Sequence, residues 1–357
     1  MACLEKGRLE AFAFCPERRD MIQYDVLTIG NAIVDIIART DNAFLEEQGI
    51  PKGSMTLIDT TRAQSLYNAM GPAVEMSGGS AANTAAGVVS LGGTAGYIGK
   101  VCDDQLGAIF THDIRALGIA FQTAPLSTGP ATARSMILVT PDGERSMNTY
   151  LGACVELSPD DIDEELVAAA KVTYFEGYLW DPPLAKDAIR KAASIAHANG
   201  RDVAITLSDS YCVYRYRAEF LDLMRSSAVD IVFANEAEVL ALYETKNFDA
   251  ALTQLAADVR KFGAVTRGEK GCVVVEGKTR IDVPATEVST VVDTTGAGDL
   301  FAAGFLRGYT GGLSKKVSAQ LGVVAAGQII AQIGPRFAGS IRDTADVSKL
   351  LGVSSHL

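Results

Sequence analysis

The stretch "DTTGAGDLFAAGFLRGYT", residues 293–310, places two glycines and two acidic residues ahead of an apolar run. Apolar and small residues recur behind the turn at helical spacing: Leu300, Phe301, Gly304, Phe305 and Gly308. The first amide groups of a helix have no internal partner, and the helix dipole makes that end partly positive. The sequence therefore predicts a helix whose N-terminus can receive an anion, with Asp299 in its first turn.

A simpler interpretation of this turn stays open when it is taken alone. Asp299 would then only complement the helix dipole, and the glycines would only shape the turn. Other phosphate-binding motifs fit the chain less well. The dinucleotide fingerprint needs glycine where Phe301 stands, and the Walker A pattern fails in residues 94–101 because Thr94 and Val101 replace required residues.

Strand-like and helix-like segments alternate through the middle of the chain. Near-continuous apolar runs, typical of strands buried on both faces, occupy residues 24–30, 171–177, 202–209 and 229–235. Helical patterns between and after them occupy residues 185–200, 219–226 and 248–263. This alternation predicts an α/β fold with a doubly wound, mostly parallel sheet.

Two regions interrupt this alternation with short strands and turns, at about residues 39–60 and 119–150. In residues 133–150, two strand-like runs flank Pro141-Asp142-Gly143, which predicts a hairpin. We expect the two regions to form a small sheet over one edge of a main domain. The expected division is a loosely held extension (1–20), one domain (21–345) and a C-terminal tail (346–357).

Composition narrows the function class. The 357 residues are 48% hydrophobic and carry 32 basic against 43 acidic side chains, so a general basic surface for nucleic acid is excluded. Six cysteines form no CxxC pair, and with three histidines they give no zinc-ligand spacing. No apolar run reaches the ~18 residues of a membrane span. Free thiols and the lack of a signal-peptide pattern predict a cytoplasmic protein.

Polar residues cluster at three further positions that a parallel sheet would bring to its carboxyl edge, where ligands bind. Each cluster alone is also compatible with an ordinary turn or helix start. The residues concerned are Asn31 and Asp35 after the first strand, Gly78, Gly79 and Asn83 at a small-residue helix, and Asn235 and Glu238 after the strand at 229–233.

Together these motifs resemble the ribokinase-like (PfkB) carbohydrate kinase family, over about residues 24–340. Residues 293–308 are similar to its C-terminal signature, and residues 78–107 to its N-terminal one. The sequences "NEAE" and "TRGEKG" lie between them in the family's order. The resemblance implies a three-layer ribokinase-like fold with a small β-sheet lid, and ATP-dependent phosphorylation of an alcohol.

The resemblance also implies roles for residues of the reaction centre. Asp299 would be the catalytic base, and the amides of Gly296, Ala297 and Gly298 would form the anion hole. Such a site suits phosphoryl transfer, which depends on positioning and charge stabilisation.

Further roles concern ATP and metal ions. Asn235 and Glu238 would order Mg²⁺ through water, while Thr266 and Gly268 would hold the ATP phosphates and ribose. Arg145 matches a lid arginine that reaches the phosphates. Asp293 and Thr295 match positions near a monovalent-cation site, which makes K⁺ a candidate cofactor.

The stretches "GNAIVDI", "GGSAAN" and "IPKGSMTLID" resemble the adenosine kinase branch of the family more than ribokinase. By this resemblance Asp35 would hold the ribose hydroxyls. The same resemblance places a substrate pocket around Asn31, Gly78, Gly79, Ser80 and Asn83, with Met55, Leu57 and Phe175 flanking the base.

The nature of the acceptor has alternatives. An aspartate that binds vicinal hydroxyls can bind any furanose. A sugar kinase acting on ribose or fructose is therefore an alternative to a purine nucleoside kinase. A non-catalytic sensor on the same fold is the third hypothesis, because a fold does not determine function. The expected partner is a small molecule, with no nucleic acid and no membrane, and the chain is expected to be a monomer or homodimer.

Overall fold

The computed structural model describes residues 23–352. The predicted N-terminal extension, 1–20, lies outside the described residues. The predicted tail, 346–357, is described only as far as residue 352, and most of that part belongs to helix α12 (Ala345–Leu351). No helix within residues 23–352 is long and apolar enough to cross a membrane.

A nine-stranded sheet forms the centre of the molecule, in the order β14-β13-β12-β11-β10-β9-β1-β5-β6. The strands from β12 to β6 are parallel, and β13 and β14 are antiparallel additions at one edge. The predicted mostly parallel sheet is therefore confirmed. Its strands are β1 (Tyr24–Ile29), β5 (Ala95–Ile98), β6 (Ala120–Phe121), β9 (Ala170–Glu176), β10 (Asp202–Thr206), β11 (Ile231–Asn235), β12 (Phe262–Thr266), β13 (Cys272–Glu276) and β14 (Thr279–Val283).

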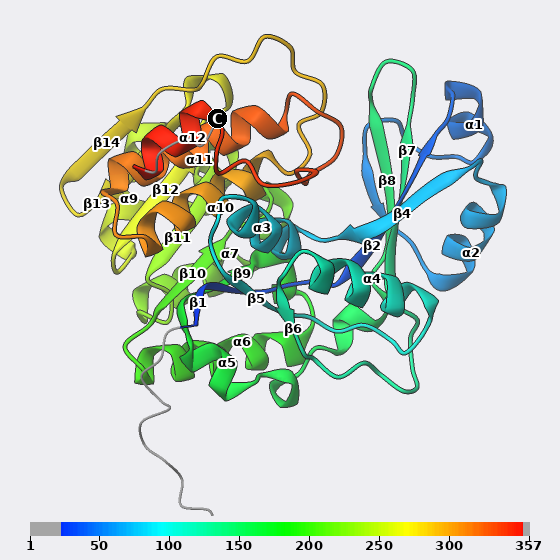
Figure 1. The fold of residues 1–357 in the computed structure, drawn as a ribbon, viewed down its shortest axis with the longest axis horizontal. Coiled ribbons are helices and arrows are strands. Elements are labelled where there is room, and N and C mark those ends of the chain that lie inside the picture. The colour runs from blue at the N-terminus through cyan, green and yellow to red at the C-terminus, as the bar shows by residue number, and fades with distance from the viewer. Residues whose placement is uncertain (1–22, 353–357) are drawn as a thin grey trace, which may run out of the picture.

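Helices cover both faces of this sheet, so the body has the predicted three layers (Figure 1). One face carries α3 (Ser80–Ser90), α4 (Gln105–Ala116), α10 (Ala297–Thr310), α11 (Lys315–Ile329) and α12. The other face carries α5 (Glu164–Ala168), α6 (Pro183–Ala198), α7 (Ser210–Arg225), α8 (Glu236–Leu242) and α9 (Phe248–Asp258). Side chains alternate along each strand, so neighbouring residues such as Tyr174 and Phe175 belong to different hydrophobic clusters.

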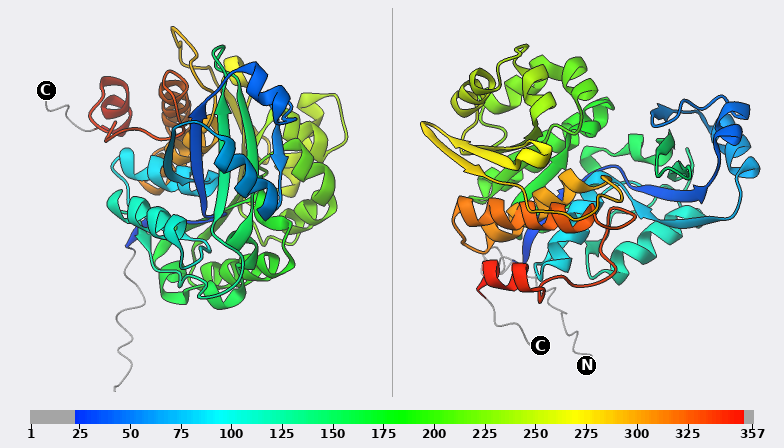
Figure 2. Two further views of the ribbon diagram at one scale, coloured as in Figure 1. Left: turned by 90° about the vertical axis from the view of Figure 1, so that its right-hand side faces the viewer. Right: turned by 90° about the horizontal axis from the view of Figure 1, so that it is seen from above.

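A second, five-stranded sheet stands to one side of the body and is called the lid here (Figures 1 and 2). Its order is β3-β8-β7-β2-β4, and β7 and β8 form the predicted hairpin. The lid elements are β2 (Ile33–Arg39), α1 (Asn42–Glu47), β3 (Met55–Leu57), α2 (Thr60–Ala69), β4 (Ala73–Gly78), β7 (Ala133–Val139) and β8 (Arg145–Tyr150).

The lid is longer than the first segment that the sequence marks as an interruption (39–60) and shorter than the second (119–150). Strand β2 begins at residue 33, because the apolar run after β1 leaves the large sheet and continues into the lid. Strand β4 returns the chain to the body at α3, whereas β6 pairs with β5 in the large sheet. Two connections at the end of the lid, between β1 and β2 and between β4 and α3, therefore lie where lid and body meet.

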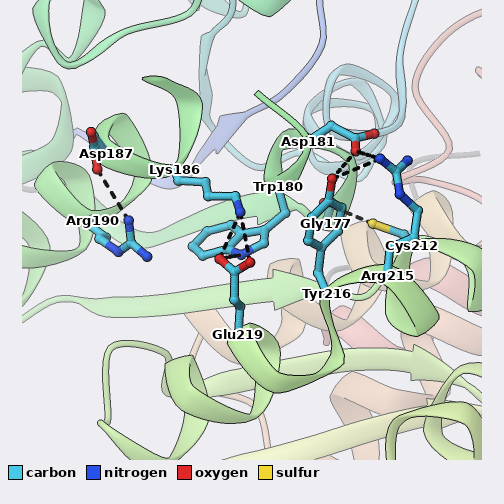
Figure 3. A network of polar contacts seen from close by, with 10 residues as sticks. All are labelled: Gly177, Trp180, Asp181, Lys186, Asp187, Arg190, Cys212, Arg215, Tyr216 and Glu219. Atoms are coloured by element: carbon cyan, nitrogen blue, oxygen red, sulfur yellow. Dashed lines mark hydrogen bonds and ion pairs between the residues drawn. The ribbon is translucent and has the colours of Figure 1, made fainter. Parts of the chain in front are cut away.

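A polar network around Trp180 lies between α6 and α7 (Figure 3). Trp180 Nε1 donates to a carboxylate oxygen of Glu219 at 2.8 Å, and Lys186 Nζ pairs with the same oxygen at 2.8 Å. The Trp180 ring stacks on Phe175 with centroids 6.4 Å apart. Phe175 is thus part of the hydrophobic core on this face.

Candidate active site

The predicted anion-binding turn begins α10. Gly296 has φ of 79°, and a β-carbon there would lie 2.7 Å from Pro335 Cβ, so both conformation and packing require glycine. The Ala297 amide donates to Thr294 O at 3.2 Å. The amides of Gly296 and Gly298 donate to no protein acceptor in the described part of the chain. Those two amides are available for an anion at the helix N-terminus.

The carboxylate of Asp299 is held by helix α3. Ser80 Oγ donates to one oxygen at 2.6 Å, and Asn83 Nδ2 donates to the other at 3.0 Å. Burial raises the pKa of Asp299 to about 6, against the hydrogen bonds from Ser80 and Asn83, which favour the ionised form. Above that pH the group is an oriented, ionised carboxylate that can accept a proton.

Asp35, on lid strand β2, lies close to the same place. A β-carbon on Gly78 would be 2.4 Å from Asp35 Cγ, so this glycine lets the carboxylate pack against the backbone. Burial raises the pKa of Asp35 to about 6, although Arg336 and Arg145 favour its charged form. Asp35 is therefore a second carboxylate that ionises near neutral pH.

The remaining residues of the predicted substrate pocket also meet at the junction of lid and body. Gly79 has φ of 93°, and a β-carbon there would lie 2.3 Å from Asn31 O. Asn31 and Asn83 are both buried, each with 5% of its surface exposed. The structure thus brings Asn31, Asp35, Gly78, Gly79, Ser80 and Asn83 together around Asp299.

Glu176 belongs to this junction and was missed by sequence reasoning. It ends β9, and its two carboxylate oxygens accept from Asn31 N at 3.0 Å and Ala81 N at 2.8 Å. Burial raises its pKa to about 7. It therefore ties the connection between β1 and β2 to the first turn of α3. A signal existed, because the apolar run at 171–175 ends in an acidic residue at a strand's carboxyl end.

Arg336 was also missed. It follows α11 and donates from Nε to Asn83 Oδ1 at 2.9 Å, and from a terminal nitrogen to Ser77 Oγ. Only the position of "IGPRF" after an apolar helix hints at it, and no local pattern predicts a contact with a residue 253 positions earlier.

Asn235 and Glu238 form a hydrogen-bonded pair where β11 meets α8. Glu238 N donates to Asn235 Oδ1 at 2.9 Å, while the Glu238 carboxylate accepts from Asn235 N at 2.9 Å and from Asn235 Nδ2 at 2.6 Å. Burial raises the pKa of Glu238 to about 7. Residues 23–352 hold no cluster of three His, Cys, Asp or Glu side chains suited to a metal.

Thr266 and Gly268 lie beside that pair. Thr266 ends β12 and is the register partner of Asn235 in β11. Gly268 follows with φ of 56° and is exposed. The four residues predicted to bind ATP and order its metal from the body thus share one edge of the large sheet.

Arg145, at the start of β8, forms an ion pair with Asp293 in the turn before α10, and both side chains are buried. The other contacts of Asp293 are with Thr295 N at 3.0 Å and Gly334 N at 2.8 Å. Asp293, predicted near a cation site, therefore already faces a guanidinium. This pair links the lid hairpin to the anion-binding turn.

The three residues predicted to flank a base are separated. Met55 and Leu57 lie on one face of lid strand β3, with 47% and 51% of their surface exposed. Phe175 is 1% exposed and lies in the core beside Trp180. The structure does not bring Phe175 to the site, because alternation along β9 directs Glu176 there instead.

Comparison with known proteins agrees with this geometry. Residues 25–341 match the model of the pfkB family carbohydrate kinases. The crystal structure of an adenosine kinase from Sinorhizobium meliloti is 67% identical, with a TM-score of 0.85 over 90% of this chain and 98% of that one. A probable sugar kinase from Rhizobium etli is 60% identical, with a TM-score of 0.87 over 92% and 100%. An adenosine kinase of Saccharomyces cerevisiae is 26% identical over 87% of this chain and 96% of the relative.

Proposed function

The chain belongs to the pfkB family of carbohydrate kinases, and from that premise we propose that it phosphorylates the 5′-hydroxyl of a purine nucleoside, adenosine first. It is a kinase with an alcohol as acceptor, and kinases of this family use ATP and usually Mg²⁺. The observation that supports this proposal most directly is the oriented carboxylate of Asp299 beside two unpartnered amides at the start of α10. The 67% identity to an adenosine kinase favours the nucleoside.

Asp299 is the proposed catalytic base. Its hydrogen bonds to Ser80 and Asn83 leave each carboxylate oxygen one lone pair for the incoming hydroxyl. With a pKa of about 6, the carboxylate is ionised at neutral pH yet close enough to that pH to accept a proton.

The amides of Gly296 and Gly298 are the proposed anion hole, with Ala297 between them. They belong to a helix whose dipole favours negative charge at this end. Fixed donors of this kind stabilise charge that develops on the transferring phosphoryl group without reorganising during the reaction. Arg145 adds a positive charge from the lid, at the position of Asp293.

The acceptor is proposed to lie between Asp35 and Asp299. An ionised Asp35 accepts hydrogen bonds from vicinal hydroxyls, and Asn31 lies beside it at the end of β1. Such an arrangement directs the third, primary hydroxyl of a ribose toward Asp299. Met55 and Leu57 are proposed to cover the base when the lid closes, since their exposed apolar surface lies on the lid.

ATP is proposed to occupy the edge formed by Asn235, Glu238, Thr266 and Gly268. When bound, Mg²⁺ supplies charge neutralisation on the phosphates, and Glu238 with Asn235 would hold its water shell. K⁺ is proposed near Asp293 and Thr295, where Arg145 already provides a cationic partner of Asp293. The free cysteines of the described region fit the proposed cytoplasmic location.

A sugar kinase is the second candidate, since the Rhizobium etli relative of 60% identity is described as a probable sugar kinase. The deciding experiment measures ADP release with ATP and Mg²⁺ over a panel of adenosine, guanosine, inosine, ribose and fructose. Adenosine is expected to give the highest kcat/KM. A higher kcat/KM for ribose or fructose would make the enzyme a sugar kinase.

A further inference from the structure

The segment that follows α11 reaches the site at three consecutive residues. Gly334 N donates to Asp293 at 2.8 Å, and Pro335 packs against Gly296 at the start of α10. Arg336 Nε donates to Asn83 Oδ1 at 2.9 Å. Family resemblance assigned no role to these residues, yet they touch the turn before the anion hole, the anion hole and the residue that holds the base.

The contact between Arg336 and Asn83 determines how the Asn83 amide is oriented. A guanidinium has only donors, so the amide must present its oxygen to Arg336. Its NH₂ group then points the other way, toward Asp299, to which it donates at 3.0 Å. With the amide reversed, its oxygen would face a carboxylate oxygen and repel it.

The charge of Arg336 acts on the same carboxylates. Its positive charge favours the ionised forms of both Asp299 and Asp35, and so lowers their pKa values against the effect of burial. Four titratable groups on four elements interact electrostatically with the guanidinium: Asp35 on β2, Tyr97 on β5, Asp113 on α4 and Asp299 on α10.

Arg336 is in addition anchored to the lid strand β4. A terminal nitrogen donates to Ser77 Oγ, and the other donates to Gly78 O at 3.4 Å. Gly78 is the residue against which Asp35 packs. One planar side chain therefore spans from the acceptor end of the site to the base.

We propose that Arg336 is a positioning residue, which orients the Asn83 amide so that its NH₂ group donates to the Asp299 carboxylate. This inference rests on the proposed function in one respect, the role of Asp299 as base. It does not depend on whether the acceptor is a nucleoside or a sugar.

The test compares two variants. Arg336→Gln removes both the positive charge and the planar set of guanidinium donors, whereas Arg336→Lys keeps only the charge. Arg336→Gln is expected to move the acid limb of the kcat/KM–pH profile up by about one unit and to lower kcat by about 10–100-fold. Arg336→Lys is expected to leave the limb in place but to lower kcat by about 10-fold. The matched control is Arg342→Gln, an exposed arginine of the same segment that lies against Gly92, and it should change neither.

A double-mutant cycle separates positioning from a merely structural effect. If Arg336 acts through Asn83, Arg336→Gln combined with Asn83→Ala should cost no more kcat than the larger single loss. Additive losses, or an unmoved acid limb in Arg336→Gln, would overturn the proposal. If Arg336→Gln fails to fold, wild-type kcat in Arg336→Lys would overturn it.

A readout without turnover keeps this inference apart from the proposed function. Carboxyl ¹³C titration of aspartate-labelled protein, with the Asp299 signal identified by its loss in Asp299→Asn, reports the ionisation of the base directly. Its midpoint should rise by about one unit in Arg336→Gln. An unchanged midpoint rejects the inference, whereas a wild-type enzyme that phosphorylates no alcohol in the panel rejects the proposed function.

Discussion

The part of the candidate site on the body is already held by hydrogen bonds, whereas the apolar part on the lid is half-exposed. On the body, Asp299 already has two hydrogen bonds, from Ser80 and Asn83, and the amides of the anion hole are fixed by a helix. On the lid, Met55 and Leu57 have about half of their surface exposed. From this difference we propose that the residues for phosphoryl transfer lie on the body, and that the lid completes recognition of the acceptor.

The comparison of body and lid predicts the largest loss of kcat for substitution of Asp299, the proposed base, which lies on the body. Asp299→Asn removes the proton acceptor and should lower kcat by about 10³-fold, while adenosine affinity changes little. Steady-state kinetics with calorimetric binding measures both. Asp187→Asn, an exposed aspartate of α6 on the other face of the sheet, is the matched control. More than a tenth of wild-type kcat in Asp299→Asn would remove the base assignment.

The ion pair that joins lid to body should show the next largest effect. Arg145→Met removes the charge beside Asp293 and the proposed phosphate contact, so kcat should fall by about 10–100-fold. The KM for adenosine should change by less than about 3-fold, because Arg145 pairs with Asp293 and not with Asp35 or Asn31. Arg39→Met, an exposed arginine of lid strand β2, is the control. A larger effect on KM than on kcat would place Arg145 in acceptor recognition instead.

The lid surface should change recognition alone. Met55→Ser removes apolar surface that would be buried against the base, and the KM for adenosine should rise by about 10-fold at unchanged kcat. Ribose, which has no base, should show no change in KM. Leu184→Ser, an equally exposed leucine on α6, serves as the control. An equal change for ribose and adenosine would mean that Met55 affects lid closure and not the base.

The smallest effect concerns pH, and it joins both regions. Asp299 on the body and Asp35 on the lid each have a pKa raised to about 6, and both must be ionised for their proposed roles. The value of kcat/KM is therefore expected to be highest above that pH and to fall below it. Because two carboxylates must be ionised, the slope of log kcat/KM against pH should approach two on the acid side. A profile between about pH 5 and 8 tests this. In Asp35→Asn the limb should become a one-proton limb, and an unchanged slope would contradict the paired ionisation.

Local sequence patterns predicted the elements that carry the site better than the contacts within it. The helix start at residues 296–299, the strands of the parallel sheet and the hairpin at 133–150 were predicted from spacing and turn residues and are present in the structure. The site roles of Asp299, Asp35 and Arg145 came from family resemblance and remain predictions. Glu176 was missed although the acidic end of its apolar run was a usable signal, whereas Arg336 contacts a residue distant in the sequence and has no local signal.

Sequence by itself determined where the reactive turn would form, because unpartnered amides and positive φ values are properties of a few adjacent residues. The tertiary structure alone decided which side chains meet there. Asn83 lies 216 positions from Asp299 and Arg336 lies 253 positions from Asn83, yet one chain of hydrogen bonds joins them. It also decided that Glu176 and not Phe175 faces the site, since the register of β9 in the sheet sets which alternate side chains point toward α3.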